Sequence, residues 1–181
     1  MKSAGRRAID LSGFEAKFMV TADPWQTFTA RDEAIKRSRI VRALGNRRVA
    51  RLLELASGNG SNSQRLARRA LKLDACDGSA SAVRHTQNAL RDAPHARAWH
   101  IALPDRLPGN RYEAVVIAEL LYYLPPRAMQ RLARDVAGVD EMVNYTVSGS
   151  ALDKVLKRFG VSVGDGLGKS LGLDAGAPNI R

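Results

Sequence analysis

Two short polar segments of the sequence carry residue types that could bind a small ligand, and each comes directly after a predicted strand. The first, Glu54 to Gly60, reads Glu-Leu-Ala-Ser-Gly-Asn-Gly and opens a predicted helix. Glycines at such a turn let the backbone approach a ligand closely, and the first turn of a helix offers free N–H groups. The second segment is Asp77-Gly78, where a carboxylate can accept both hydroxyls of a ribose. The two segments in this order favour an adenosine-type ligand.

Each of these segments also has a purely structural interpretation. A pair such as Gly58 and Gly60 is often no more than a tight turn, and Asp77 can cap the helix that follows it. A dinucleotide site is excluded, because its fingerprint requires a third glycine where Ser63 stands. The spacing alone leaves both the ligand site and the structural interpretation open.

The most apolar segment of the chain, 112–119, ends in an acidic residue that two tyrosines follow. Its continuous apolar run is typical of a strand buried on both faces, and Glu119 lies at its carboxyl end, with Tyr122 and Tyr123 just beyond. Because α/β sheets bind ligands outside the carboxyl ends of their strands, these side chains are candidates for accepting or orienting a proton. A solvated carboxylate, and tyrosines packed against the next helix, are the structural alternatives.

Alternating strands and helices position these segments. Apolar runs predict strands at 49–55, 71–76, 98–103, 112–119 and 142–147, and helical spacing predicts helices at 30–44, 64–71, 81–90, 125–136 and 151–159. Residues 61–64 resemble a capping box before the second of these helices, whereas residues 1–21 are mixed in composition and are expected to be mobile at their start. This alternation is typical of an α/β sandwich, with a mostly parallel sheet and helices on both faces.

Composition and charge limit the classes of protein. The chain has 181 residues, enough for one domain, and 29 Lys and Arg against 18 Asp and Glu give a net charge of +11. Arginines at helical spacing, without interleaved aromatic residues, favour solvated faces over a nucleic-acid site. One cysteine excludes a disulfide scaffold, and three scattered histidines offer no metal site. Without a signal sequence or an apolar run of membrane-spanning length, a cytoplasmic protein is expected.

Further motifs resemble those of a known family. An Asp-Pro-Trp segment at 23–25 precedes a predicted helix that contains Glu33 and Lys36, and the most apolar strand continues as Glu-Leu-Leu-Tyr-Tyr-Leu-Pro. Together with the Glu-x-x-x-Gly-x-Gly loop and the acidic residue after the second strand, these motifs resemble the class I S-adenosylmethionine (SAM)-dependent methyltransferases, and within them the nodulation protein S (NodS) type. The resemblance spans about residues 23–147.

The resemblance implies a Rossmann-like class I methyltransferase fold in a single domain. That domain would have an N-terminal cap and helix at 1–45, a SAM-binding core at 46–147 and an atypical tail at 148–181, in which the final strand hairpin is incomplete. SAM is the implied cofactor. The implied reaction is methyl transfer to the amine of a small molecule or an amino sugar, as in nodulation-factor-type oligosaccharides.

Residue by residue, the resemblance implies that Gly58 and Gly60 face the methionine part of SAM and that Asp77 holds its ribose. At the mouth of the site, Glu119 or a tyrosine hydroxyl would accept or orient the proton of the acceptor amine, which attacks only when neutral. The residues that the resemblance places at the site are, for the cofactor, Glu54, Ala56, Gly58, Gly60, Asp77, Gly78, Ala102, Leu103 and Ala118, for the cap and acceptor, Trp25 and Lys36, and for catalysis, Glu119, Tyr122 and Tyr123.

The sequence departs from the family pattern at three alanines. Ala56 stands at the first glycine of the loop, Ala102 at the acidic residue after the third strand and Ala118 at a serine before the glutamate. Ala56, Ala102 and the short tail leave open a non-catalytic protein that retains the fold. The net charge of +11 leaves open a methyltransferase of RNA or DNA, although amino-group enzymes of that class carry an Asp/Asn-Pro-Pro-aromatic loop where this chain has Ala-Glu-Leu-Leu.

Overall fold

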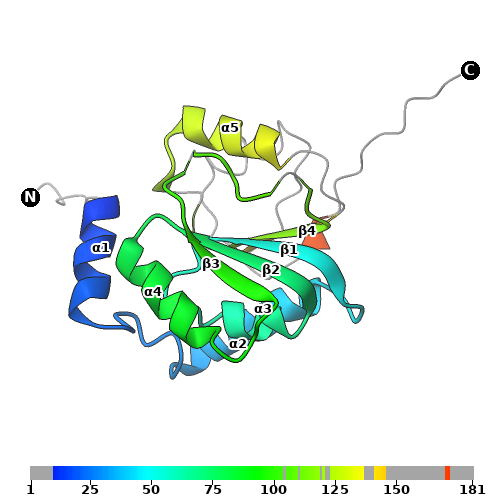
Figure 1. The fold of residues 1–181 in the computed structure, drawn as a ribbon, viewed down its shortest axis with the longest axis horizontal. Coiled ribbons are helices and arrows are strands. Elements are labelled where there is room, and N and C mark those ends of the chain that lie inside the picture. Colours follow the sequence, from blue (N-terminus) through cyan, green and yellow to red (C-terminus); the bar gives the residue numbers. More distant parts are fainter. Residues whose placement is uncertain are drawn as a thin grey trace, which may run out of the picture.

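One sheet with helices on both sides forms the core of the protein, shown in Figure 1. The structure, a computed structural model, describes residues 10–103, 105–109, 111–118, 120, 123–136, 141–145 and 170–171. The strands within these residues are β1 (Val49–Leu55), β2 (Ala70–Asp77), β3 (Ala96–His100), β4 (Ala114–Ala118), β5 (Glu141–Tyr145) and β6 (Ser170–Leu171). The helices within them are α1 (Leu11–Val20), α2 (Arg31–Ala43), α3 (Ser63–Ala67), α4 (Ala80–Ala89) and α5 (Pro126–Asp135).

The strand order is β3-β2-β1-β4-β5-β6, which confirms the expected α/β class. Neighbouring strands from β3 to β5 are parallel, and β6 runs antiparallel to β5. Each parallel connection crosses from one strand to the next through a helix or a loop, so the sheet is wound outward in both directions from β1 and β4.

The two faces of the sheet bury different residues, because successive side chains of a strand point to opposite sides. Leu53 of β1 packs with Leu132 of α5 in one apolar cluster. Leu52, the neighbouring residue, packs with Ile40 of α2 and Leu66 of α3 in the other. Figure 1 shows α5 on one side of the sheet and α2 and α3 on the opposite side. Burial on both faces accounts for the continuous apolar run of β4.

Parallel pairing brings the ends of the central strands to one edge of the sheet. Leu55 at the end of β1 pairs with Cys76 on β2 and Ile117 on β4, and Asp77 pairs with His100 on β3. The segments that follow these four strands therefore leave the sheet side by side, at the edge where α/β folds bind ligands.

Most helix and strand positions agree with the predictions from sequence, but the N-terminal region differs. The predicted helix at 30–44 is α2, and it ends before Gly45, whose φ of +70° is typical of a glycine after a helix. Residues 11–20 form α1, where the sequence predicts no element. Asp10 caps this helix by accepting a hydrogen bond from the backbone N–H of Gly13 at 2.9 Å.

Two further predictions are wrong in detail. The helix expected at 64–71 ends at Ala67, because β2 already begins at Ala70 in order to pair with β1. Its expected capping box is absent: Asn62 makes no capping hydrogen bond through its side chain. β3 ends at His100, earlier than predicted, so residues 101–103 lie in the loop after the strand.

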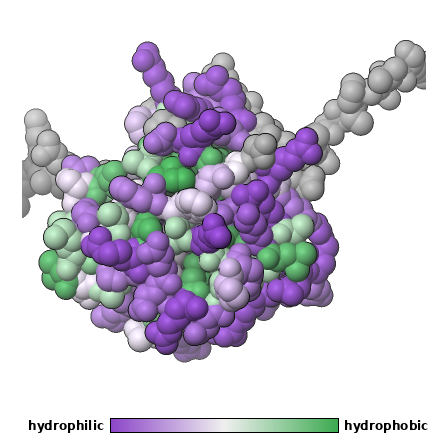
Figure 2. All heavy atoms as spheres, viewed as in Figure 1, coloured by the Kyte–Doolittle hydropathy of each residue, from purple (hydrophilic) through white to green (hydrophobic). Residues whose placement is uncertain are grey.

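Much of the surface visible in Figure 2 is hydrophilic. Among the residues that the structure describes, no helix is both long and apolar enough to cross a membrane. The predicted helix at 151–159, as well as Glu119 and Tyr122, lies outside the described residues.

Candidate functional site

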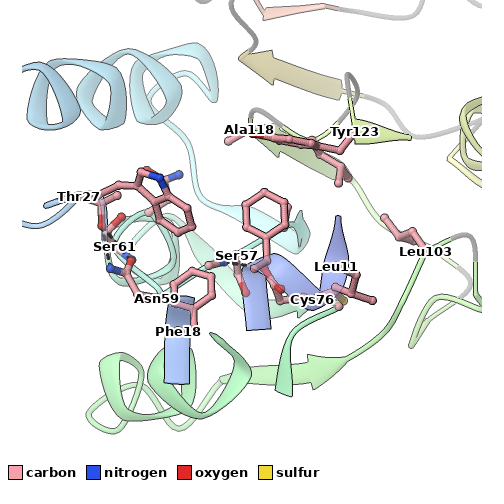
Figure 3. A pocket seen from close by; sticks show the side chains of 18 of the residues that line it. Leu11, Phe18, Thr27, Ser57, Asn59, Ser61, Cys76, Leu103, Ala118 and Tyr123 are labelled. Carbon is pink, nitrogen blue, oxygen red and sulfur yellow. Dashed lines mark hydrogen bonds between the residues drawn. The ribbon is translucent and has the colours of Figure 1, made fainter. Parts of the chain in front are cut away.

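A cavity of about 610 Å³ lies at the carboxyl edge of the sheet and is bounded by α1 (Figure 3). Its volume suits a small-molecule site. In Figure 3, Thr27, Asn59 and Ser61 lie at one side of the cavity, and Leu11 and Leu103 lie at the other. Ten of the residues predicted for the site line it, namely Trp25, Lys36, Ala56, Gly58, Asp77, Gly78, Ala102, Leu103, Ala118 and Tyr123.

The loop after β1 turns through the left-handed region of backbone conformation. The φ angle is +58° at Ala56, +57° at Gly58 and +84° at Gly60. A Cβ on Gly60 would lie 2.8 Å from the Cβ of Ala89 and 2.9 Å from the Cα of Thr86, so this glycine permits close packing with α4. Gly60 is thus not in the cavity wall, in contrast to the prediction that it faces a ligand. Thr86 also donates a hydrogen bond to the carbonyl of Gly58 at 2.9 Å, which holds the loop against α4.

Asp77 lies in the cavity wall and connects the loops after β1 and β2. Its Oδ2 accepts a hydrogen bond from the backbone N–H of Gly58, and its Oδ1 accepts one from that of Ser79, both at 2.9 Å. Ser79, and not Asp77, is the N-cap of α4. Burial raises the pKa of the Asp77 carboxyl, and these two hydrogen bonds oppose the rise. Each carboxylate oxygen retains a lone pair for a hydroxyl donor on a ligand.

Glu54 lies behind the loop and is fully buried, with 0% of the residue exposed. Its Oε2 accepts a hydrogen bond from the Ser63 hydroxyl at 2.5 Å, whereas its Oε1 has no hydrogen-bond partner. Burial raises the pKa of this carboxyl to about 8, against the effect of the Ser63 hydrogen bond. Glu54 is therefore mostly neutral at pH 7, and it is not in the cavity wall as predicted from the sequence.

Aromatic rings from α1 close the cavity on the side away from the sheet, and sequence analysis missed them. The Phe14 and Phe18 rings lie 5.7 and 5.3 Å from the Trp25 ring, measured between centroids. The Phe14 ring also packs perpendicular to the ring of Tyr123, with their centroids 5.0 Å apart. Contacts of this kind contribute about 0.5–1.5 kcal/mol per pair beyond burial, so they stabilise the packing of α1 against the cavity.

A carboxylate on α1 binds the start of α4, next to Asp77. Glu15 accepts hydrogen bonds from the hydroxyls of Ser79 and Ser81, each at 2.6 Å, and from the Ser81 backbone N–H at 3.1 Å. The Ser79 hydrogen bond is the main reason why the pKa of Glu15 falls to about 2. Sequence analysis did not predict this contact, which spans more than 60 residues of sequence.

A charged pair from α2 lines another part of the cavity. The Nζ of Lys36 lies 2.7 Å from Oε1 of Glu33, and both residues are half-buried. Ala118 and Leu120, which flank Glu119 in the sequence, also line the cavity. The cavity thus combines a glycine-containing loop, a half-buried carboxylate, an aromatic cover and a charged pair, which is a set suited to a nucleoside carrying a zwitterionic group.

Comparisons with known proteins agree with this geometry. The model of the family "Nodulation protein S (NodS)" matches residues 13–169. Nodulation protein S of Sinorhizobium fredii (strain NBRC 101917 / NGR234) is 25% identical over 145 residues, which cover 78% of this chain and 67% of that protein.

Solved structures show the same fold. The N-methyltransferase NodS of Bradyrhizobium japonicum WM9, in complex with S-adenosyl-L-homocysteine, superposes with a TM-score of 0.69 at 18% identity, covering 87% of this chain and 79% of that one. A putative methyltransferase of Pseudomonas syringae superposes with a TM-score of 0.65 at 25% identity, covering 78% and 97% of the two chains.

A parallel sheet wound in this order, with its cavity at the ends of β1, β2 and β4, is the fold of these methyltransferase structures, and the family match shows that the chain is a SAM-dependent methyltransferase. The family match narrows that class. The chain belongs to the nodulation protein S family.

Proposed function

We propose that this chain transfers the methyl group of SAM to the neutral amine of a small molecule or an amino sugar. The observation that carries the proposal is one cavity that joins the glycine loop and Asp77, on the cofactor side, with the segment around Ala118 and Tyr123. The family match supports N-methylation, and the NodS structure contains S-adenosylhomocysteine, the demethylated form of the cofactor.

The residues present fit SAM. Asp77 offers a half-buried carboxylate to the ribose hydroxyls, in a cavity that the apolar side chains of Leu11 and Leu103 also line. Gly58 lines the cavity without a side chain, and the Lys36–Glu33 pair offers both charges to the amino-acid end. When bound, SAM supplies an activated methyl group on a sulfonium whose sulfur is the leaving group.

The residues of the chain contribute positioning, exclusion of water and control of one proton. Holding the amine in line with the methyl group can contribute about 7–11 kcal/mol to catalysis. The rings of Phe14, Phe18 and Trp25 cover the cavity and exclude water from it. Glu119, or the hydroxyl of Tyr122 or Tyr123, would accept or orient the proton of the acceptor, since an ammonium has no lone pair to attack with.

Calorimetric titration with SAM, followed by a methyl-transfer assay with glucosamine-type amines, tests the proposal. Binding together with transfer to an amine supports it. Absence of SAM binding would favour a non-catalytic protein that retains the fold. Salt-dependent binding of RNA or DNA, with methyl transfer to it, would favour a nucleic-acid methyltransferase instead.

We expect Asp77→Ala to weaken SAM binding by about 1–3 kcal/mol, because the ribose loses charge-assisted hydrogen bonds to the half-buried carboxylate. Titration calorimetry measures the loss. Asp92→Ala, which removes a carboxylate from the exposed turn after α4, serves as the control and should leave the affinity unchanged. Equal affinities of the two variants would restrict Asp77 to its structural contacts with Gly58 and Ser79.

We expect Ala56→Gly to be tolerated and to tighten SAM binding. Ala56 has a φ of +58°, where a Cβ costs about 1–2 kcal/mol and its removal lets the loop approach the ligand. Thermal unfolding should show equal or higher stability, whereas Ala34→Gly, on the exposed surface of α2, should lose about 1 kcal/mol. Weaker SAM binding by Ala56→Gly would indicate that the loop is adapted to a different ligand.

A further inference from the structure

Asp23 is not in the cavity wall, yet its carboxylate accepts four hydrogen bonds. Oδ1 accepts from the backbone N–H of Thr27 at 2.7 Å, from the Thr27 hydroxyl at 2.9 Å and from the side-chain amide of Asn59 at 2.9 Å. Oδ2 accepts from the backbone N–H of Phe28 at 3.1 Å. One carboxylate thus shapes the turn that contains Trp25 and also reaches the loop after β1.

Asn59 is the residue of the glycine loop that Asp23 contacts. It lies between Gly58 and Gly60, and only 5% of it is exposed. Its amide Nδ2 also donates to the hydroxyl of Thr27 at 2.8 Å, and its Oδ1 accepts from the backbone N–H of Ser61 at 3.3 Å. Figure 3 shows Thr27, Asn59 and Ser61 grouped at one side of the cavity. The side chain of Asn59 therefore connects the turn that contains Asp23 and Thr27 to the loop after β1.

The loop needs such an external constraint. Its two glycines and the left-handed Ala56 give the free backbone many accessible conformations, and ordering it on binding would reduce affinity. Burial alone would raise the pKa of Asp23, but the hydrogen bonds from Phe28, Thr27 and Asn59 outweigh burial and lower the pKa. The carboxylate is therefore ionised at neutral pH, and its hydrogen bonds are of the stronger, charge-assisted kind.

We propose that Asp23 is a positioning residue that acts through Asn59 to hold the glycine loop in the conformation that receives SAM. The same carboxylate fixes the turn that contains Trp25, so hydrogen bonds of Asp23 join this turn to the loop after β1. The inference rests on the proposed function, because SAM affinity is its readout.

The first test compares the SAM affinity and the turnover of Asp23→Ala. The dissociation constant for SAM should rise about 10- to 30-fold, the effect of losing hydrogen bonds to a charged group. Turnover at saturating SAM should fall less than threefold, because Asp23 touches neither substrate. Asp23→Asn retains the Oδ1 acceptor and should show a smaller rise. Thr29→Val removes an exposed hydroxyl from the same turn and should change nothing.

A double-mutant cycle then tests the route of the effect. If Asp23 acts through Asn59, the double variant Asp23→Ala/Asn59→Ala should bind SAM no more weakly than Asn59→Ala alone. Additive losses would overturn the inference. Should Asp23→Ala fail to fold by circular dichroism, Thr27→Val decides instead, because it removes the hydroxyl contacts with both Asp23 and Asn59 and retains the backbone hydrogen bond to Asp23.

The possible failures are distinguishable. If the unmodified protein does not bind SAM, the proposed function fails. If the unmodified protein binds SAM, and folded Asp23→Ala or Thr27→Val binds it equally well, the proposed function stands and only the role of Asp23 is overturned.

Discussion

Replacement of Glu119 by glutamine is expected to lower methyl transfer by roughly 10²–10⁴-fold, the usual contribution of a positioned acid or base. The expectation follows from the sequence and from the neighbouring residues, because Glu119 itself lies outside the described residues. Ala118 and Leu120 both line the cavity at the end of β4, the edge at which α/β sheets bind ligands. A carboxylate acting on the acceptor should leave SAM affinity almost unchanged.

The control for Glu119→Gln is Glu113→Gln, a second glutamate just before β4 but at its opposite end. Glu113 pairs with Arg47 and accepts a hydrogen bond from the backbone N–H of Ala50, away from the cavity. Both variants are assayed with glucosamine-type amines and titrated with SAM. Normal turnover of Glu119→Gln would contradict its role as the proton acceptor, and loss of SAM binding would assign it to the cofactor site.

Much of the fold could be predicted from hydrophobic patterns in the sequence. β4 is a continuous apolar run because both of its faces are buried, the loop after β1 carries the glycines, and the acidic residue Asp77 ends β2. Parallel pairing then brings these loops to one edge regardless of their distance in sequence. This topological rule is why eight predicted site residues, from Ala56 to Tyr123, line the same cavity, whereas Trp25 and Lys36 reach it from the segments before β1.

α1 is a helix that the sequence pattern did not predict. Leu11, Phe14 and Phe18 have helical spacing behind the capping residue Asp10, and this signal was available. The opposite face is also apolar at its end, however, because Val20 is 87% exposed. A helix without a clear contrast between its faces gives a weak periodic signal, so the sequence predicts only a region of mixed composition.

Contacts between distant segments also could not be predicted. The hydrogen bond of Asn59 with Asp23 joins residues 36 positions apart, and no local pattern encodes it. Gly60 has the same sequence signature as Gly58, and only the position of α4 shows that it serves packing. Glu54 reads as part of a ligand motif, and only the structure shows that it is enclosed behind the loop.

Burial of Glu54 predicts a pH dependence of stability. Its pKa rises from the ordinary value of 4.5 to about 8 in the folded state, so the folded protein binds a proton there that the unfolded chain has lost. Stability is therefore greatest below pH 4.5 as far as this group is concerned, and it falls as pH rises toward 8. Above pH 8 Glu54 is ionised in both the folded and the unfolded state, and the stability that its protonated form contributes is fully lost.

Glu54→Gln replaces the carboxyl with a neutral group of the same shape and should remove this pH dependence. Between pH 5 and pH 8 the unmodified protein should lose on the order of 2–4 kcal/mol more unfolding free energy than Glu54→Gln, measured by urea denaturation. Ser63→Ala, which removes the hydroxyl that donates to Oε2, should retain the pH dependence and increase it. Parallel pH curves for the unmodified protein and Glu54→Gln would contradict the raised pKa. They would show that the carboxyl is ionised in the folded protein and that its Oε1 accepts a hydrogen bond in solution.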